Sequence, residues 1–324
     1  MRNLAVTLFL LAVVLVAPMT LHAQDVSAMT GVVTDSTGAA LPGTTVTLTN
    51  SQTGVSYTQT SDGSGTYRFT NIPPGPGYSV GFVHAGFATS TVDNVYLNVA
   101  ITRTQNAKLS VGERQTVEVS ASNSGVTFNT TDASVGNNFD AKLLNDLPVQ
   151  ARDNPAALFT LQPGVTLNGA VTGARVDQDN VTLDGLDVND FATGNAFVIV
   201  AKAPIDSIQE FRGITAGFPT NSGPGGGGQF QLVTKSGTNN FHGNINEYHR
   251  DVSTVANDWF NNNAGIARPK YIQNQFGGNV GGPIKHDKAF FFFDFNDSRI
   301  GRRSELNGPR QHDVVRRPEG GGPR

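Results

Sequence analysis

The sequence predicts a mostly β protein that begins with a β-sandwich. The chain is rich in Gly, Thr, Asn and Val and poor in Lys and Glu, a composition that favours strands and turns over helices. Short segments of alternating polar and apolar residues recur between turn residues, at intervals typical of a sandwich. Only 15% of the residues are charged, against roughly 25% in an average soluble domain, which disfavours salt-bridged helical surfaces.

Length and charge exclude several classes of protein. A chain of 324 residues suggests two or three domains. A net charge of −3 argues against general nucleic-acid binding. The sequence has no Cys, which excludes disulfides, thiolate catalysis and cysteine zinc sites.

The first segment, residues 1–23, is predicted to be a secretory signal peptide. Arg2 precedes an apolar run, Leu4–Ala17, and Pro18 precedes Leu21-His22-Ala23, which predicts cleavage after Ala23. A transmembrane anchor is the alternative, but the run of about 14 residues is shorter than the roughly 20 that a spanning helix needs. We therefore expect an exported protein.

Residues 24–111 carry the strand pattern of the predicted sandwich. Turn residues at 35–38, 62–65 and 73–77 separate the alternating segments. The apolar residues expected to point inward are Val46, Leu48, Tyr67, Phe69, Tyr78, Val80 and Phe82. About 85 residues can bury one modest core.

Five short motifs occur in this segment: Gly31–Asp35, Leu41–Val46, Asp62–Tyr67, Ile72–Gly75 and Gly86-Phe87. In these residues the segment resembles the carboxypeptidase regulatory-like (transthyretin-like) domain. The chain lacks the His-x-x-Glu and His-Glu-x-x-His spacings of zinc peptidases, so the resemblance implies no peptidase activity. A passive spacer and a module that binds a glycan or peptide both remain open.

Residues 112–128 are predicted to be a linker that contains a recognition segment. Val117 and Val119 alternate with polar residues, and Ser120–Gly125 has the composition of a flexible linker. A free strand on such a linker suits strand addition to a partner's sheet. The segment resembles the TonB box of outer-membrane receptors, with Gln115 where an acidic residue is commoner; the box-like residues are Gln115, Thr116, Val117, Glu118, Val119, Ser120 and Ala121. The alternative is that this run is the last strand of the sandwich.

Residues 129–239 contain six short motifs in a fixed order. They are Leu144–Pro148 with Arg152–Asn154, Leu161–Val165, Asn180–Gly185, Pro204–Phe211 and Val233–Asn239. Their order and spacing resemble the plug domain of TonB-dependent receptors, particularly the Oar-like group, which has an N-terminal regulatory-like sandwich. The resemblance implies an α+β plug. Its motif residues here are Asp184, Gly185, Glu210, Phe211, Thr234, Lys235, Ser236 and Gly237.

Local patterns in this region predict specific elements. Leu183 and Leu186 flank a tight Asp184-Gly185 turn, and Ile205, Ile208 and Phe211 fit one face of a short helix or strand after Pro204. The glycine-rich run at 223–228 is expected to be a flexible connector into a strand at 229–234.

Other candidate sites fail on spacing. The acidic cluster of Asp177, Asp179, Asp184, Asp187 and Asp190 does not follow the ligand pattern of an EF-hand, so turn capping is the favoured explanation. Gly225–Gly228 with Lys235-Ser236 lacks the glycine spacing of a phosphate loop, and His242 and His249 are seven residues apart. We predict no catalytic, metal or cofactor-binding residues, and no enzyme.

Residues 240–300 are predicted to be the first strands of an incomplete transmembrane β-barrel. Three strand-length segments, 241–248, 271–281 and 289–299, are separated by a long polar loop and then by a tight turn at Gly281–Asp287. Trp259, Phe260 and Tyr271 are candidates for an aromatic girdle, although loop contacts would explain them equally well. Phe290–Phe293 makes both faces apolar, so this prediction depends on the resemblance of 242–243, 274–278, 281–284 and 287–293 to the family's first strands.

The segment after Asn239 is too short for a whole barrel. Its 85 residues suffice for about three strands, whereas large plugged transporters have 22. The resemblance is expected to end near Arg299, and residues 301–324 are Arg-, Gly- and Pro-rich. A truncated or frame-shifted gene is the favoured hypothesis, and a native basic disordered tail is the alternative.

The resemblance implies the N-terminal part of a TonB-dependent transporter of unknown substrate, not transport-competent in this form. Its expected partners are the TonB energy-transducing complex, which would bind by strand addition, outer-membrane lipid, and an extracellular ligand such as a glycan or peptide. The expected location is the outer membrane, or the periplasm if the fragment cannot insert. A secreted carbohydrate- or peptide-binding or adhesion protein that uses the sandwich is the alternative.

Overall fold

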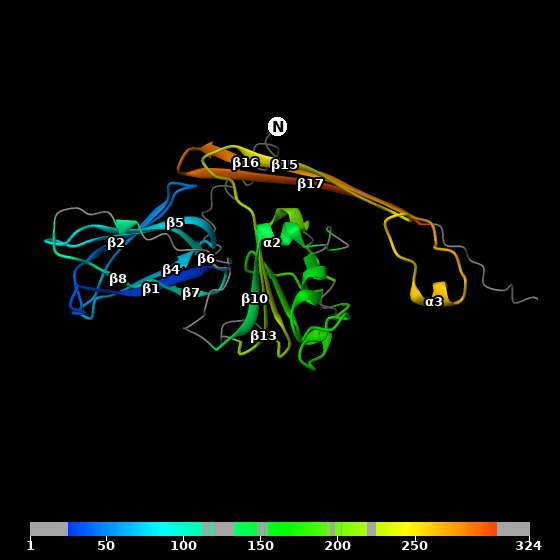
Figure 1. The fold of residues 1–324 in the computed structure, drawn as a ribbon, viewed down its shortest axis with the longest axis horizontal. Helices are drawn as coiled ribbons and strands as arrows, with labels where there is room; N and C mark the ends of the chain where they lie inside the picture. The colour runs from blue at the N-terminus through cyan, green and yellow to red at the C-terminus, as the bar shows by residue number, and fades with distance from the viewer. Residues whose placement is uncertain are drawn as a thin grey trace, which may run out of the picture. The chain divides into compact units, whose positions relative to one another are not determined.

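The computed structural model describes residues 25–112, 117–118, 133–147, 149, 152, 155–190, 192–194, 198–201, 203–218 and 225–302. The predicted signal peptide with its cleavage site, and residues 303–324 of the predicted tail, lie outside the described residues. Within these ranges the chain is mostly β, as predicted, and the strands form four sheets (Figure 1). No helix in these ranges is long and apolar enough to cross a membrane.

The described residues form two compact units. The first runs to His242 and includes Gly281–Phe292, and the second contains Gly243–Val280 and the residues from Phe293 onward. The first unit holds two domains, a sandwich and a mixed sheet.

The sandwich consists of two sheets that face each other as layers (Figure 1). In one sheet, β1 pairs with antiparallel β4 and with parallel β7 and β8. In the other, the order is β3-β2-β5-β6-β9. The strand bounds are β1 Ser27–Thr34, β2 Thr45–Asn50, β3 Ser56–Thr60, β4 Thr66–Ile72, β5 Gly75–Val83, β6 Ser90–Leu97, β7 Thr102–Thr104, β8 Ala107–Lys108 and β9 Val117–Glu118.

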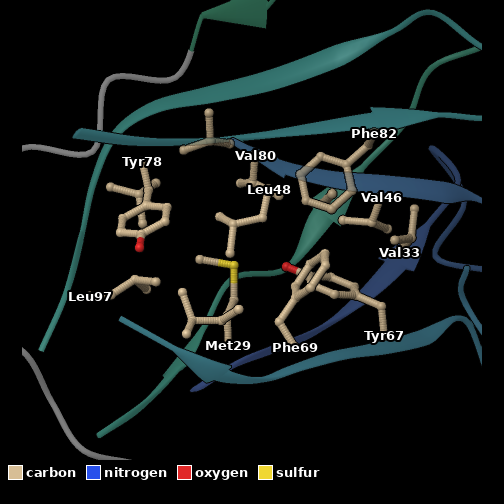
Figure 2. Packing of buried hydrophobic residues seen from close by; sticks show 14 of the residues in the cluster. Met29, Val33, Val46, Leu48, Tyr67, Phe69, Tyr78, Val80, Phe82 and Leu97 are labelled. Atoms are coloured by element: carbon tan, nitrogen blue, oxygen red, sulfur yellow. The ribbon is translucent and has the colours of Figure 1, made fainter. Parts of the chain in front are cut away.

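Alternation along the strands builds the sandwich core. In β1, buried and half-buried residues alternate strictly, because successive side chains of a strand point to opposite faces. Figure 2 shows side chains from both sheets meeting between the layers. All seven residues predicted to point inward are at most 2% exposed: Val46, Leu48, Tyr67, Phe69, Tyr78, Val80 and Phe82. The prediction of the core is therefore confirmed.

A mixed five-stranded sheet follows, in the order β10-β13-β14-β11-β12. Its pairs are antiparallel except for β11 with β14, which is parallel. The strand bounds are β10 Val135–Asp140, β11 Asn180–Leu183, β12 Leu186–Asp187, β13 Ile208–Ala216 and β14 Gln229–Thr234. The short helices are α2 Ala141–Asp146, η1 Pro155–Leu161, η2 Val176–Gln178 and η3 Ile205–Ser207.

Three local predictions for this domain, the turn at Asp184-Gly185, the element after Pro204 and the strand at 229–234, agree with the structure. Leu183 pairs with Leu186 across a turn in which Asp184 and Gly185 have φ of 51° and 80°, as a type I′ turn requires. A single helical turn, η3, follows Pro204 and leads into β13, and Ile205, Ile208 and Phe211 are all buried. The strand predicted at 229–234 is β14.

A third sheet contains β15 His242–Asp251, β16 Tyr271–Lys285 and β17 Ala289–Arg302, in that order, with α3 Trp259–Asn263 between β15 and β16. One prediction here was wrong: Gly281–Lys285 belongs to β16, and only His286–Lys288 forms the turn. The hairpin closes within three residues because Asp287 adopts a left-handed φ of 59°, and the Lys288 N–H bonds the Lys285 carbonyl (3.1 Å).

Candidate functional site

The TonB-box-like segment is described at two residues. Val117 and Glu118 form β9, which pairs in parallel with β6 through Ser90 and Thr91. Gln115, Thr116, Val119, Ser120 and Ala121 lie outside the described residues. The pairing matches the alternative left open by the sequence, a last strand of the sandwich, and it places β9 at the edge of a sheet. A strand held at an edge by few backbone bonds can exchange to another sheet.

The Asp184-Gly185 motif connects three strands of the mixed sheet. The Asp184 carboxylate accepts hydrogen bonds from the Thr234 N–H (2.9 Å) and hydroxyl (2.8 Å). The Gly185 N–H donates to Asp25 Oδ2 (3.1 Å), just before β1. Two motifs that are about 50 residues apart thus meet between β11 and β14.

Phe211 belongs to a stack of three aromatic rings. Its ring centroid is 5.7 Å from that of Phe159 and 6.3 Å from that of Phe230, and the centroids of Phe159 and Phe230 are 4.1 Å apart. All three side chains are at most 1% exposed. The motif residue Phe211 therefore has a packing role.

The neighbouring motif residue, Glu210, is buried among neutral donors. Its Oε1 accepts from the Nδ2 atoms of Asn98 (2.9 Å) and Asn138 (2.6 Å), and its Oε2 from the Val99 N–H (3.1 Å). Burial raises the pKa of Glu210 to about 7, although these hydrogen bonds and nearby Arg212 act in the opposite direction.

The Thr234–Gly237 motif joins β14 to a buried ion pair. The Lys235 N–H donates to the Ser207 carbonyl (2.8 Å) and its Nζ to the Asp206 carbonyl (2.7 Å). Asp206 Oδ1 in turn pairs with Arg152 Nη2 at 3.0 Å, with both side chains at most 5% exposed. Sequence reasoning missed this pair, because Arg152 and Asp206 lie in different motifs, 54 residues apart, and no local pattern links them.

Ser236 and Gly237 end the motif. Ser236 Oγ donates to the Gly237 carbonyl (3.3 Å). A Cβ on Gly237 would lie 2.2 Å from the Phe291 carbonyl oxygen, so any larger residue would force the backbones apart.

In the described part of the chain, no group of three or more His, Asp or Glu side chains that could hold a metal ion is found. The members of the acidic cluster hold separate turns: Asp177 pairs with Arg175, Asp187 accepts from Asn189, and Asp190 accepts from Ala192. Asp179 accepts from the Gly228 N–H (2.6 Å), and burial raises the pKa of Asp179 to about 6.

The glycine run was predicted to be a flexible connector, but its described part packs closely. The Gly227 N–H bonds the Gln178 carbonyl (3.0 Å), and a Cβ on Gly227 would lie 2.2 Å from Asp179 Oδ1. Glycine is needed at this position for close approach of the backbone.

The described residues thus form a β-sandwich, a mixed sheet and a sheet of long paired strands, in that order along the chain. Residues 28–110 match the family model "Carboxypeptidase regulatory-like domain", and residues 233–308 match "Outer membrane beta barrel domain". The second match extends past Arg299, where the resemblance was predicted to end.

One relative of the chain is the TonB-dependent transporter Oar of Myxococcus xanthus, to which it is 27% identical over 280 residues. The aligned region covers 78% of this chain and 25% of that protein. With the two family models, this match confirms the predicted resemblance to Oar-like TonB-dependent receptors with an N-terminal regulatory-like domain.

Solved structures are more distant. A putative carbohydrate-binding protein from Bacteroides uniformis is 9% identical with a TM-score of 0.23, covering 86% of this chain and all of that one. Catechol 1,2-dioxygenase from Acinetobacter sp. ADP1 is 12% identical with a TM-score of 0.22, covering 31% of this chain and 60% of that one. Scores this low carry no argument about glycan binding or catalysis.

Proposed function

We propose that this chain is the N-terminal part of a TonB-dependent outer-membrane transporter. The order of its domains carries the proposal: a sandwich, a candidate plug at 129–239, and strands that match an outer-membrane barrel model. In this scheme the mixed sheet fills the lumen, and its rearrangement opens a path for a substrate whose identity is left open.

The exposed residues of β17 support contact with lipid. Phe293 and Phe295 are 60% and 55% exposed, and they alternate with the half-buried polar residues Asp294 and Asn296. Alternation of apolar and polar residues is the pattern of a membrane strand with one face toward lipid and the other toward the lumen.

Strand addition to the TonB complex is the proposed route of energy input. β9 already pairs as a strand, which supports the ability of Val117 and Glu118 to adopt extended backbone in a sheet. The partner would take the box-like run 115–121 as an added strand.

A proline substitution tests this route. The full chain in detergent is titrated with the purified periplasmic domain of TonB. Val117→Pro removes a backbone donor and should weaken binding at least about tenfold. Val117→Thr keeps both the N–H and a β-branched side chain, so it should bind like the parent. Equal binding by the Pro variant and the parent would refute strand addition at this segment.

Membrane flotation tests the location. The expressed chain should lose residues 1–23, so that mass spectrometry finds Gln24 as the first residue. The mature chain should float with outer-membrane lipid, or stay in the periplasmic fraction if its strands do not insert. Ala23→Arg should block processing, because the cleavage site needs a small residue. Full processing of that variant, or mature chain that stays with inner-membrane vesicles, would contradict the proposal.

A further inference from the structure

The sandwich and the mixed sheet of the first unit meet at two carboxylates whose hydrogen-bond donors, among the described residues, are all uncharged. The first is Glu210 of β13, which is fully buried. Two of its three donors, Asn98 Nδ2 and the Val99 N–H, come from the sandwich, directly after β6. This loop is itself held by the sandwich, since Ser27 Oγ donates to the Asn98 carbonyl and the Ala100 N–H to the Val26 carbonyl.

The second carboxylate is Asp25, which precedes β1. Its Oδ2 accepts from the Thr182 hydroxyl (2.8 Å) and the Gly185 N–H (3.1 Å), and its Oδ1 from Gln231 Nε2 (3.1 Å). All three donors belong to the mixed sheet or its turn. Each domain thus supplies one carboxylate that accepts hydrogen bonds from donors in the other domain.

Among the described residues, the charged groups nearby offset only part of the effect of burial on these carboxylates. Arg212 lies near Glu210 but directs its Nη1 to Asn138 Oδ1 (3.1 Å) and its Nη2 to Ser134 Oγ (2.8 Å). The other titratable groups nearby are Tyr96 of β6 and Asp140 of β10. Asp25 faces Asp184, a like charge. A buried carboxylate with only neutral donors is costly to ionise.

We propose that the sandwich docks on the mixed sheet through Glu210 and Asp25, and that loss of protons from these two carboxylates weakens the docking.

The direction of the pH dependence follows from linkage. Burial raises the pKa of Glu210 to about 7 and also raises the pKa of Asp25. A carboxylate with a raised pKa stabilises the docked state below its ordinary pKa, and this contribution is lost as pH rises through the docked value. Docking should therefore be strongest near pH 4 and weaken toward pH 8, by at most about tenfold per pH unit for each group.

The absence of Cys allows the docking to be measured directly on the full chain. Nitroxide labels are placed at Thr58→Cys of β3 and Lys142→Cys of α2, two exposed positions in different domains. Pulsed electron paramagnetic resonance follows the distance between the labels during urea titration, and circular dichroism reports when the strands unfold. We expect separation of the domains to need less urea at pH 8 than at pH 5.

Three variants sharpen the test. Glu210→Gln and Asp25→Asn mimic the protonated groups, so each should reduce the pH dependence and the double variant should remove it. Glu247→Gln, an exposed carboxylate of β15, should leave it unchanged. Equal urea midpoints at pH 5 and pH 8 in the parent, or full pH dependence in the double variant, would overturn the proposal.

Discussion

The sandwich and the mixed sheet bury different kinds of residue. The buried polar residues of the sandwich are three hydroxyl side chains, Ser27, Thr44 and Ser61. The mixed-sheet domain buries charged residues as well: Arg152, Asp179, Asp206, Glu210 and Arg212. One domain is therefore held mainly by apolar packing, whereas the other also depends on polar partners that are far apart in the sequence.

The largest expected effect is the loss of the buried ion pair. Arg152→Ala removes one partner of the buried pair with Asp206, which should cost about 3–5 kcal/mol of unfolding free energy. Hydrogen exchange of β13 and β14 amides measures this loss. Lys142→Ala breaks an exposed pair with Asp146 and should cost less than about 1 kcal/mol. If the two variants lost equal stability, the comparison between buried and exposed pairs would fail.

The matching experiment in the sandwich creates a cavity. Leu48→Ala removes a fully buried side chain of β2 and should cost about 2–5 kcal/mol, measured by hydrogen exchange of β2 and β5 amides. Leu48→Met conserves volume and should cost less than about 1.5 kcal/mol. A small loss for the Ala variant would show that apolar packing does not dominate this domain.

A turn substitution should have a moderate effect. Gly185→Ala places a Cβ at φ of 80°, which should destabilise the β11–β12 turn by about 1–2 kcal/mol. Gly63 is exposed, and a Cβ there meets nothing within 4 Å. The unfolding free energy of Gly63→Ala should therefore be within about 0.5 kcal/mol of that of the parent. Equal stabilities would contradict the type I′ turn.

The smallest expected effects are those of single carboxylates on pH dependence, and they have opposite signs in the two domains. Hydrogen bonds from Thr37 and Ser64 lower the pKa of Asp35 and of Asp62, so their contribution to the sandwich is lost as pH falls below 3.8. Burial raises the pKa of Asp179, so its contribution is lost as pH rises from 3.8 through about 6. Asp179→Asn should flatten the profile of the mixed sheet, measured by hydrogen exchange of β11 amides between pH 4 and pH 7. An unchanged profile would contradict the assignment.

Some features of this protein were determined by the sequence alone. The alternating segments around Leu48, Tyr67 and Phe82 predicted the sandwich core, and Asp184-Gly185 between two leucines predicted a hairpin turn. These features can be predicted from the sequence because side-chain alternation and left-handed turn residues depend on only a few neighbouring positions. The strand predicted at 229–234, which is β14, follows from the same kind of local pattern.

Local sequence patterns did not predict which distant residues meet. The pairing of Arg152 with Asp206, the burial of Glu210 under the loop after β6, and the placement of β9 beside β6 join positions 27 to 112 residues apart. The turn at His286–Lys288 also depended on how two long strands pair. Local sequence patterns encode which residues are buried, but the partner of a buried polar group is set by chain topology, because its hydrogen bonds form only after the strands have assembled.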